Sequence, residues 1–279
     1  MKKTILIISI IIVTSINLYS QCSDAGICKV GSHNFSDKNN NNSFNNVIGL
    51  RYGYGNSGSP EKIDYNGIEF YGNIAIKKNF AVSFNLPFLV QNKTAGLGDG
   101  ILTGSYIYNL RKIDKLEFSG GMKFASSKVG KNFTYQNGYG TNDLLAGLNY
   151  SGSFYSLGVS GQIPIDSYSD DNLEFKRGPD LLIQAGYFRT IENIRINLDV
   201  LLIKRLKESE IKYGNLPSSV ISNSDFTQLN LIGGASFDLS KNIGMNISVG
   251  VPVLKRDENT DGTKRALSIR LGFGYMFNI

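Results

Sequence analysis

The sequence is poor in the residue types that most metal centres and hydrolytic sites require. Its 279 residues include one His, two Cys and no Trp. This composition excludes a zinc finger or a His-rich metal centre, and it argues against a Ser-His-Asp hydrolase. Charged residues make up only 19% of the chain, too few for a coiled coil, and 41% hydrophobic content is too high for a disordered chain. We therefore expect a folded protein that needs no cofactor and is not an enzyme.

Long apolar runs are equally scarce. The one near-continuous aliphatic run, residues 5–13, follows Lys2 and Lys3 and precedes Leu18-Tyr19-Ser20. A basic start, a short apolar core and a cut after Ser20 are typical of a secretory signal peptide over residues 1–20, and the core is short for a membrane anchor. Beyond it, no stretch approaches the roughly 18 apolar residues of a transmembrane helix. The mature protein is therefore expected outside the cytoplasm and without helical spans.

The segment after the signal, residues 21–46, is polar and ends in the Asn-rich run NNNNSFNN. Its composition indicates a flexible tract, which forms either a periplasmic tail or a small plug in the body of the protein. Its Cys22 and Cys28 could close a small disulfide loop in an oxidising compartment, or they could be two free thiols.

Through the rest of the chain, apolar residues alternate with small or polar ones. In residues 243–253, six large apolar side chains fall on one face, and Gly, Asn, Ser and Pro fall on the other. This period of two is typical of a β-strand with one oily face. Twelve strands of this kind are predicted, at residues 46–56, 63–76, 79–90, 99–111, 115–127, 141–151, 153–165, 179–190, 193–206, 225–238, 242–254 and 264–278.

The connections between these strands alternate between short turns and long polar loops, which is typical of an outer-membrane barrel. A soluble β-sandwich would also alternate, but its polar face would carry many Lys, Glu and Thr residues, whereas Gly, Ser and Asn dominate here. We therefore predict an all-β fold: a transmembrane antiparallel up-and-down barrel of about 12 strands over residues 47–279, with short periplasmic turns and long extracellular loops. Its expected partners are outer-membrane lipid, lipopolysaccharide, the barrel-assembly machinery and a small-molecule solute that the sequence does not identify. No nucleic acid is expected, because the charges are scattered along the chain.

Acidic residues open several strands that return from long loops. The pleat turns Asp99, Asp143 and Asp180 toward the lumen, whereas Asp225 falls on the other face. The three inward carboxylates either cap the loop backbone through Asx-type bonds or form an acidic cluster at the outer mouth that favours cations.

Other charges also fall on the predicted inward face, with both signs present. Mixed signs favour internal salt bridges around a narrow polar passage over a strongly selective pore. These residues are Arg51, Glu69, Glu117, Lys123, Arg195, Asp199 and Arg270. Basic pairs in the outer loops are interpreted as solvated or as contacts for lipopolysaccharide phosphates: Lys176-Arg177, Lys204-Arg205, Lys255-Arg256 and Lys264-Arg265.

Three prolines recur near the outer ends of ascending strands: Pro87, Pro164 and Pro252. Because proline cannot donate to the ladder, each marks either a strand end or a kink that opens a lateral gap toward the membrane.

One outer loop matches the first half of a calcium loop, with oxygen ligands at Asp257, Asn259 and Asp261 followed by Gly262. The twelfth position is Ser268 and not the bidentate Glu, so a plain Asp-Gly turn is the alternative.

Several short motifs resemble a known family of barrels. LPF at residues 86–88, GLGD at 96–99 and GYGTND at 138–143 resemble the barrels related to the meta pathway of phenol degradation, which are similar to hydrophobic-compound transporters of the outer membrane. The resemblance covers roughly residues 68–279 and implies a barrel of about 12 to 14 strands that takes up small, often apolar molecules. No ligand residue carries over, and the long N-terminal hatch of the hydrophobic transporters is reduced here to residues 21–46.

These patterns predict an outer-membrane channel or transporter for passive passage of small molecules, apolar ones among them. The alternative is a structural or adhesive barrel that acts through its external loops. An outer-membrane phospholipase would need a His beside a Ser on the barrel wall, and the lone His33 precedes the first strand.

Overall fold

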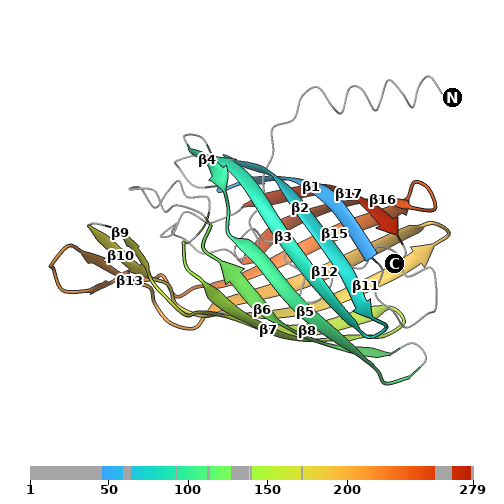
Figure 1. Cartoon of the computed structure of the whole chain (residues 1–279), viewed down its shortest axis with the longest axis horizontal. Coiled ribbons are helices and arrows are strands. Elements are labelled where there is room, and N and C mark those ends of the chain that lie inside the picture. The colour runs from blue at the N-terminus through green and yellow to red at the C-terminus, as the bar shows by residue number, and fades with distance from the viewer. Residues whose placement is uncertain are drawn as a thin grey trace.

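The computed structural model describes residues 46–58, 64–91, 94–111, 114–126, 138, 140–170, 172–254 and 266–277. All regular structure in these residues is β-strand, and none of them forms a helix long and apolar enough to span a bilayer. Twelve of the strands form one closed antiparallel barrel (Figure 1). They are β1 (Asn46–Asn56), β2 (Asp64–Lys77), β3 (Phe80–Gln91), β5 (Gly100–Asn109), β6 (Lys115–Phe124), β7 (Asp143–Ser151), β8 (Tyr155–Pro164), β11 (Asp180–Ile191), β12 (Ile194–Arg205), β15 (Thr227–Asp238), β16 (Ile243–Leu254) and β17 (Leu267–Phe277).

Each barrel strand pairs with its neighbours in the chain, and β1 pairs with β17 to close the ring. The closing register joins Asn46 to Phe277 and Asn56 to Leu267. Closure leaves no free sheet edge, which is the condition for a β-structure to cross a membrane. The predicted all-β barrel of about 12 strands is therefore confirmed, with every predicted strand boundary within three residues of its place in the structure.

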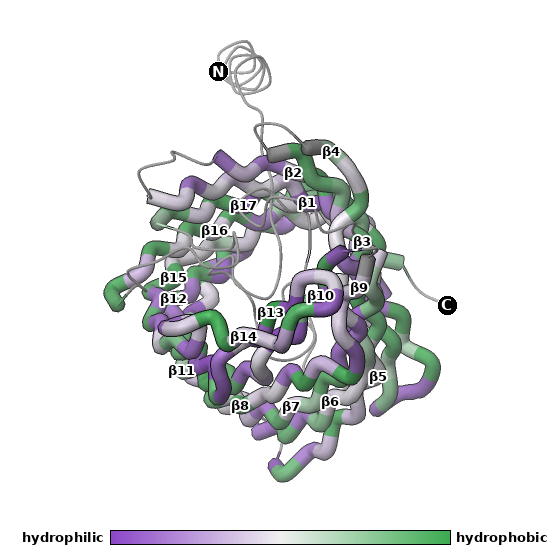
Figure 2. Tube along the Cα trace, turned by 90° about the vertical axis from the view of Figure 1, so that its left-hand side faces the viewer, coloured by the Kyte–Doolittle hydropathy of each residue, from purple (hydrophilic) through white to green (hydrophobic). Residues whose placement is uncertain are grey.

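The two faces of the wall differ in chemistry as the alternation requires. Outward side chains in mid-strand, such as Leu148, Leu198 and Val249, are 38%, 52% and 40% exposed. Inward polar neighbours are buried, as Asp199 is at 4%. Figure 2 looks along the barrel and shows its strands arranged in a ring. A wall that is apolar outside and polar inside suits a lipid surround and a polar interior.

The two ends of the barrel are unequal. At one end, called the turn end here, the strands connect through short turns such as Lys78–Asn79 and Glu192–Asn193, and Asn46 and Phe277 lie side by side. At the other end, called the loop end, the connections are longer and carry strands of their own. The predicted alternation of short and long connections matches this arrangement.

Two loops at the loop end build a second sheet that the sequence analysis interpreted as polar loop. Its order is β14-β13-β10-β9, and it projects beyond the barrel in Figure 1. The strands are β9 (Tyr168–Asp170), β10 (Leu173–Lys176), β13 (Glu210–Tyr213) and β14 (Ser219–Val220). Strands of two to four residues are too short to show a clear period, which is why the alternation missed them.

A further short strand, β4 (Thr94–Leu97), continues into β5 through a bulge. Phe88 pairs with Leu97, but Asn85 pairs with Ile101, so β4–β5 holds one extra residue between these pairs. The expected loop over residues 91–98 is therefore mostly strand. A bulge re-aims the side chains beside it, and Asp99 lies at this one.

The three prolines occupy different positions. Pro164 is the last residue of β8, as a strand terminator would be. Pro87 lies inside β3, where pairing with β2 continues on both sides of it. Pro252 lies in β16 beside a register shift against β15. The described ladders show bulges near two of these prolines, and a lateral gap toward the membrane stays a prediction.

Candidate functional site

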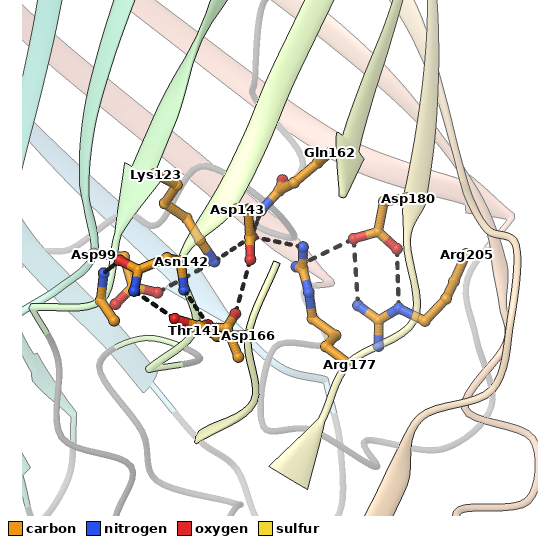
Figure 3. Close-up of polar contacts among 11 residues, drawn as sticks. Asp99, Lys123, Thr141, Asn142, Asp143, Gln162, Asp166, Arg177, Asp180 and Arg205 are labelled. Atoms are coloured by element: carbon orange, nitrogen blue, oxygen red, sulfur yellow. Dashed lines mark hydrogen bonds and ion pairs between the residues drawn. The ribbon is translucent and has the colours of Figure 1, made fainter. Parts of the chain in front are cut away.

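The inward acids at the loop end lie in a row of alternating charges. In order, the row is Asp99, Lys123, Asp143, Arg177, Asp180 and Arg205, and we call it the charge row (Figure 3). Its side chains are at most 6% exposed. The three predicted acids are thus brought together, and each of them faces at least one cation.

Asp143 is the centre of the row. It is the first residue of β7, and its cross-strand partner on β6 is Lys123. Lys123 Nζ lies 2.7 Å from Asp143 Oδ2, and Thr141 Oγ1 donates to Oδ1 over 2.9 Å. Gln162 on β8 donates a further hydrogen bond to this carboxylate. Asp143 therefore has donors from two neighbouring strands and from the residues that precede its own.

Asp99 reaches the same lysine from the bulge between β4 and β5. Lys123 Nζ lies 3.3 Å from Asp99 Oδ2. Ser126 fastens the bulge, because its hydroxyl donates to the carbonyl of Gly98 over 2.5 Å and accepts from the amide of Gly100 over 3.1 Å. One lysine therefore lies between two carboxylates.

Asp180 and Arg205 are paired by strand register. They are cross-strand partners on β11 and β12, and Arg205 Nε lies 2.9 Å from Asp180 Oδ1. The Arg205 guanidinium also lies over the ring of Phe226, 4.7 Å from its centroid. Stacking on an aromatic face and pairing with a carboxylate both suit a planar guanidinium.

Arg177 is the one member of the row that comes from the loop beyond β10, away from the barrel strands and the bulge that precedes β5. It follows β10 in the chain, and its guanidinium lies between two acids: NH2 is 2.9 Å from Asp143 Oδ2 and NH1 is 3.2 Å from Asp180 Oδ2. Figure 3 shows its side chain reaching in from the loop side toward both carboxylates. Arg177 joins the Lys123–Asp143 half of the row to the Asp180–Arg205 half.

The charge row is electrically balanced. It holds three acids and three bases, and each base contacts an acid within 3.3 Å. Buried charges persist only when they are paired, and losing one partner leaves a costly unpaired charge, about 3 to 5 kcal/mol in typical proteins. Because acids and bases are equal in number, the arrangement gives no strong preference for either sign of ion. The predicted cation preference of the acidic residues stays a prediction.

Other predicted inward charges line the wall away from the row. Arg51 and Glu69 are cross-strand partners on β1 and β2 and form a buried ion pair, and Arg51 lies 4.4 Å from the ring centroid of Tyr71. Asp199 accepts hydrogen bonds from Gln184 and Asn197.

Glu117 and Arg270 are also buried, at 6% and 3% exposure. Arg195 lies nearer the turn end, with its guanidinium 4.1 Å from the ring centroid of Phe188. The inward face therefore carries both signs of charge along its height.

Two of the four basic pairs in the outer segments do not match the prediction that they are solvated or contact lipopolysaccharide phosphates. Their arginines, Arg177 and Arg205, are buried, at 3% and 0% exposure. Only the lysines match that reading: Lys204 is 38% exposed and lies 3.7 Å from Asp225.

One of the two arginines could have been placed from the sequence. Arg205 shares strand parity with Asp199, so the pleat alone puts it inward. Arg177 lies in a connection with no periodic signal, and nothing in the sequence pairs it with distant acids. The nearby Lys207 is solvated and donates to Glu210 over 2.7 Å, which lowers the pKa of that carboxyl.

Some predicted residues lie outside the described part of the chain. They are the possible disulfide pair Cys22 and Cys28, the calcium-loop candidates Asp257, Asn259 and Asp261, and His33. Within the described ranges, no group of three or more His, Cys, Asp or Glu residues could hold a metal ion.

The closed ring of twelve strands, apolar outside and charged inside, defines a β-barrel of the outer-membrane type. The structure is similar to that of an outer membrane channel from Pseudomonas putida F1, with a TM-score of 0.62 and 13% identity over 84% of this chain and 96% of the other. It is also similar to the NanC porin, with a TM-score of 0.54 and 10% identity over 82% of this chain and 100% of the porin.

At these identities the similarity shows a shared fold. Outer membrane phospholipase A from Escherichia coli is more distant, with a TM-score of 0.44 and 9% identity over 84% of this chain and 94% of the phospholipase. No protein-family model and no curated protein sequence matches the chain.

Proposed function

We propose that this protein is a passive channel for small molecules in the bacterial outer membrane. The observation that carries the proposal is the wall itself: a closed barrel whose outward mid-strand side chains are apolar and whose inward face holds paired charges along its height. The fold shared with an outer membrane channel and a porin supports this proposal, although a fold alone does not define a function.

An apolar cluster lies beside the charge row. It is buried and consists of Leu182, Leu201, Ile203 and Ile232 on β11, β12 and β15, together with Phe226 just before β15. Four of these residues share the strand parity of the inward charges. The family resemblance in the sequence implies small, often apolar solutes, so the solutes proposed for the channel include apolar ones.

Conductance of the refolded chain, starting at Gln21, in a planar bilayer tests the proposal. Heat-modifiable electrophoretic migration first establishes that the barrel has closed. We expect discrete current steps whose size grows with salt concentration. A closed barrel that gives no current steps would contradict the proposed channel function.

The same assay separates the two readings of residues 21–46. In a variant that lacks residues 23–45, a plug predicts larger steps and a periplasmic tail predicts unchanged ones. Residue Asn46 is kept because its side chain accepts a hydrogen bond from the backbone of Ala75 in the wall.

The projecting sheet of β9, β10, β13 and β14 favours a second candidate, an adhesive barrel that acts through its loops. In this sheet Tyr213 and Val220 are 54% and 56% exposed, and Leu216 between them is 64% exposed. Such side chains outside the barrel suit a binding surface. Binding of cells that display the protein to a host or bacterial surface, lost when residues 211–219 are replaced by a linker, would support this candidate.

A further inference from the structure

We propose that Arg177 sets the ion selectivity of the channel mouth. This inference rests on the proposed channel function and deepens it, because it names one residue that decides which ions pass. Arg177 matters because the other five residues of the charge row do not balance one another in charge.

The wall and the loop contribute unequal charges to the row. Barrel strands and the bulge supply Asp99, Asp143 and Asp180 but only two bases, Lys123 and Arg205. These five residues carry one net negative charge. Arg177, which the loop supplies, brings the total to zero. The neutrality of the charge row therefore depends on a side chain that the barrel strands do not supply.

Arg177 also joins two of the acids of the row. Its guanidinium contacts Asp143 and Asp180 at once, at 2.9 and 3.2 Å, and these acids belong to strands on either side of β8. Rings of charged side chains at a constriction set which sign of ion enters a pore. Without Arg177, each of these acids would keep only one basic partner, so the site would attract cations.

The backbone next to Arg177 is held by the loop that carries β13. At Gly178, an added Cβ would lie 1.8 Å from the carbonyl oxygen of Lys207, so no other residue fits without moving the chain. The amide of Gly178 donates to Ser209 Oγ over 3.4 Å, and the amide of Leu206 donates to the carbonyl of Pro179 over 2.8 Å. The placement of Arg177 therefore depends on close contact between two outer loops.

Reversal potentials in a KCl gradient across a planar bilayer test the inference. In Arg177→Gln we expect the K⁺ to Cl⁻ permeability ratio to rise roughly 30-fold, because losing a unit charge at about 4 Å in water favours K⁺ by about 1 kcal/mol and disfavours Cl⁻ by about 1 kcal/mol. The double variant Arg177→Gln with Asp180→Asn restores the charge balance and should return the ratio toward the wild-type value. Lys176→Gln, which removes an exposed charge one residue away, should leave the ratio unchanged.

Gly178→Ala keeps every charge of the row but displaces the backbone of Arg177. We expect a rise in the permeability ratio in the same direction and of smaller size. If Arg177→Gln does not migrate as a closed barrel, Gly178→Ala decides the question by the same measurement.

The outcomes separate the two claims. A wild-type barrel that is closed but does not conduct overturns the channel function and this inference with it. A conducting wild type whose ratio is unchanged in Arg177→Gln and Gly178→Ala overturns only the role of Arg177. An equal rise in Lys176→Gln would also overturn it, because the effect would then be one of general surface charge.

Discussion

At the scale of single residues, the interior is held by pairs that the strand register makes. Arg51 faces Glu69, Lys123 faces Asp143, and Asp180 faces Arg205, each directly across a ladder. Adjacent positions on neighbouring strands bring Cβ atoms to about 5 Å, close enough for long side chains to pair. In these pairs, charges of opposite sign meet through strand pairing alone. Arg177 differs, because a loop and not a strand pairing brings it to its acids.

The pair of Arg51 and Glu69 provides a test of interior stability. Glu69→Gln would leave Arg51 buried beside Tyr71 without its carboxylate, so we expect the free energy of unfolding to fall by about 3 kcal/mol. The matched control is Glu174→Gln, because Glu174 is 43% exposed and lies 3.7 Å from Lys212. An exposed pair of this kind is worth less than about 1 kcal/mol. Denaturant titration in lipid vesicles measures the loss in free energy of unfolding for both variants. Equal losses would contradict the claim that the buried pair contributes more to stability than the exposed one.

A second residue-scale prediction concerns the glycine opposite Asp199. An added Cβ at Gly186 would lie 2.1 Å from Asp199 Oδ1, so Gly186→Ala must displace that carboxylate. We expect a loss of about 1 to 3 kcal/mol, as for other overpacked sites. Gly161→Ala is the control, since nothing lies within 4 Å of its added Cβ. The same titration measures the free energy of unfolding of both variants. If Gly186→Ala has the same value as the wild type, the carboxylate of Asp199 moves aside at little cost.

At the scale of elements, the barrel and the projecting sheet are separate in their hydrogen bonding. Described pairings join β9, β10, β13 and β14 only to one another, and the barrel strands pair among themselves. We expect a variant in which a Gly-Ser linker replaces residues 211–219 to migrate still as a closed, heat-modifiable barrel. Val200→Pro is the contrasting variant, because it breaks a ladder in β12, which pairs on both sides. If the linker variant failed to close, the sheet would be part of the folding unit.

How far the sequence predicts an element depends on its length. All twelve barrel strands were predictable because nine or more residues of alternation leave no doubt about period or face. The short strands β4, β9, β10, β13 and β14 were missed because four residues or fewer carry no clear period.

The same limit applies to the site. Strand parity could place Asp99, Asp143, Asp180 and even Arg205, because each lies on a strand or at its end. Arg177 depends on how two loops fold against each other, and local sequence does not encode that packing. The charge balance of the mouth therefore becomes visible only in three dimensions.

At the scale of the whole molecule, the apolar outer surface should mark where the bilayer lies. Val249 is near the middle of β16, and Val253 is near its loop end on the same outward face, at 40% and 68% exposure. If the barrel spans a membrane, Val249→Arg should cost about 2 to 4 kcal/mol of folding free energy and Val253→Arg about 0 to 1 kcal/mol, because the cost of a lipid-facing Arg falls from the midplane to the interface.

Unfolding in lipid vesicles measures both values, and the same pair in detergent micelles provides the control for intrinsic strand effects. The difference in cost between Val249→Arg and Val253→Arg should be large in the bilayer and small in micelles, because only a bilayer fixes the depth of each position. Equal costs at the two positions in vesicles would contradict a membrane centred on the barrel. A larger cost at Val253 would shift the band toward the loop end and put the charge row inside the hydrocarbon, where its five ion pairs would bear the full cost of burial.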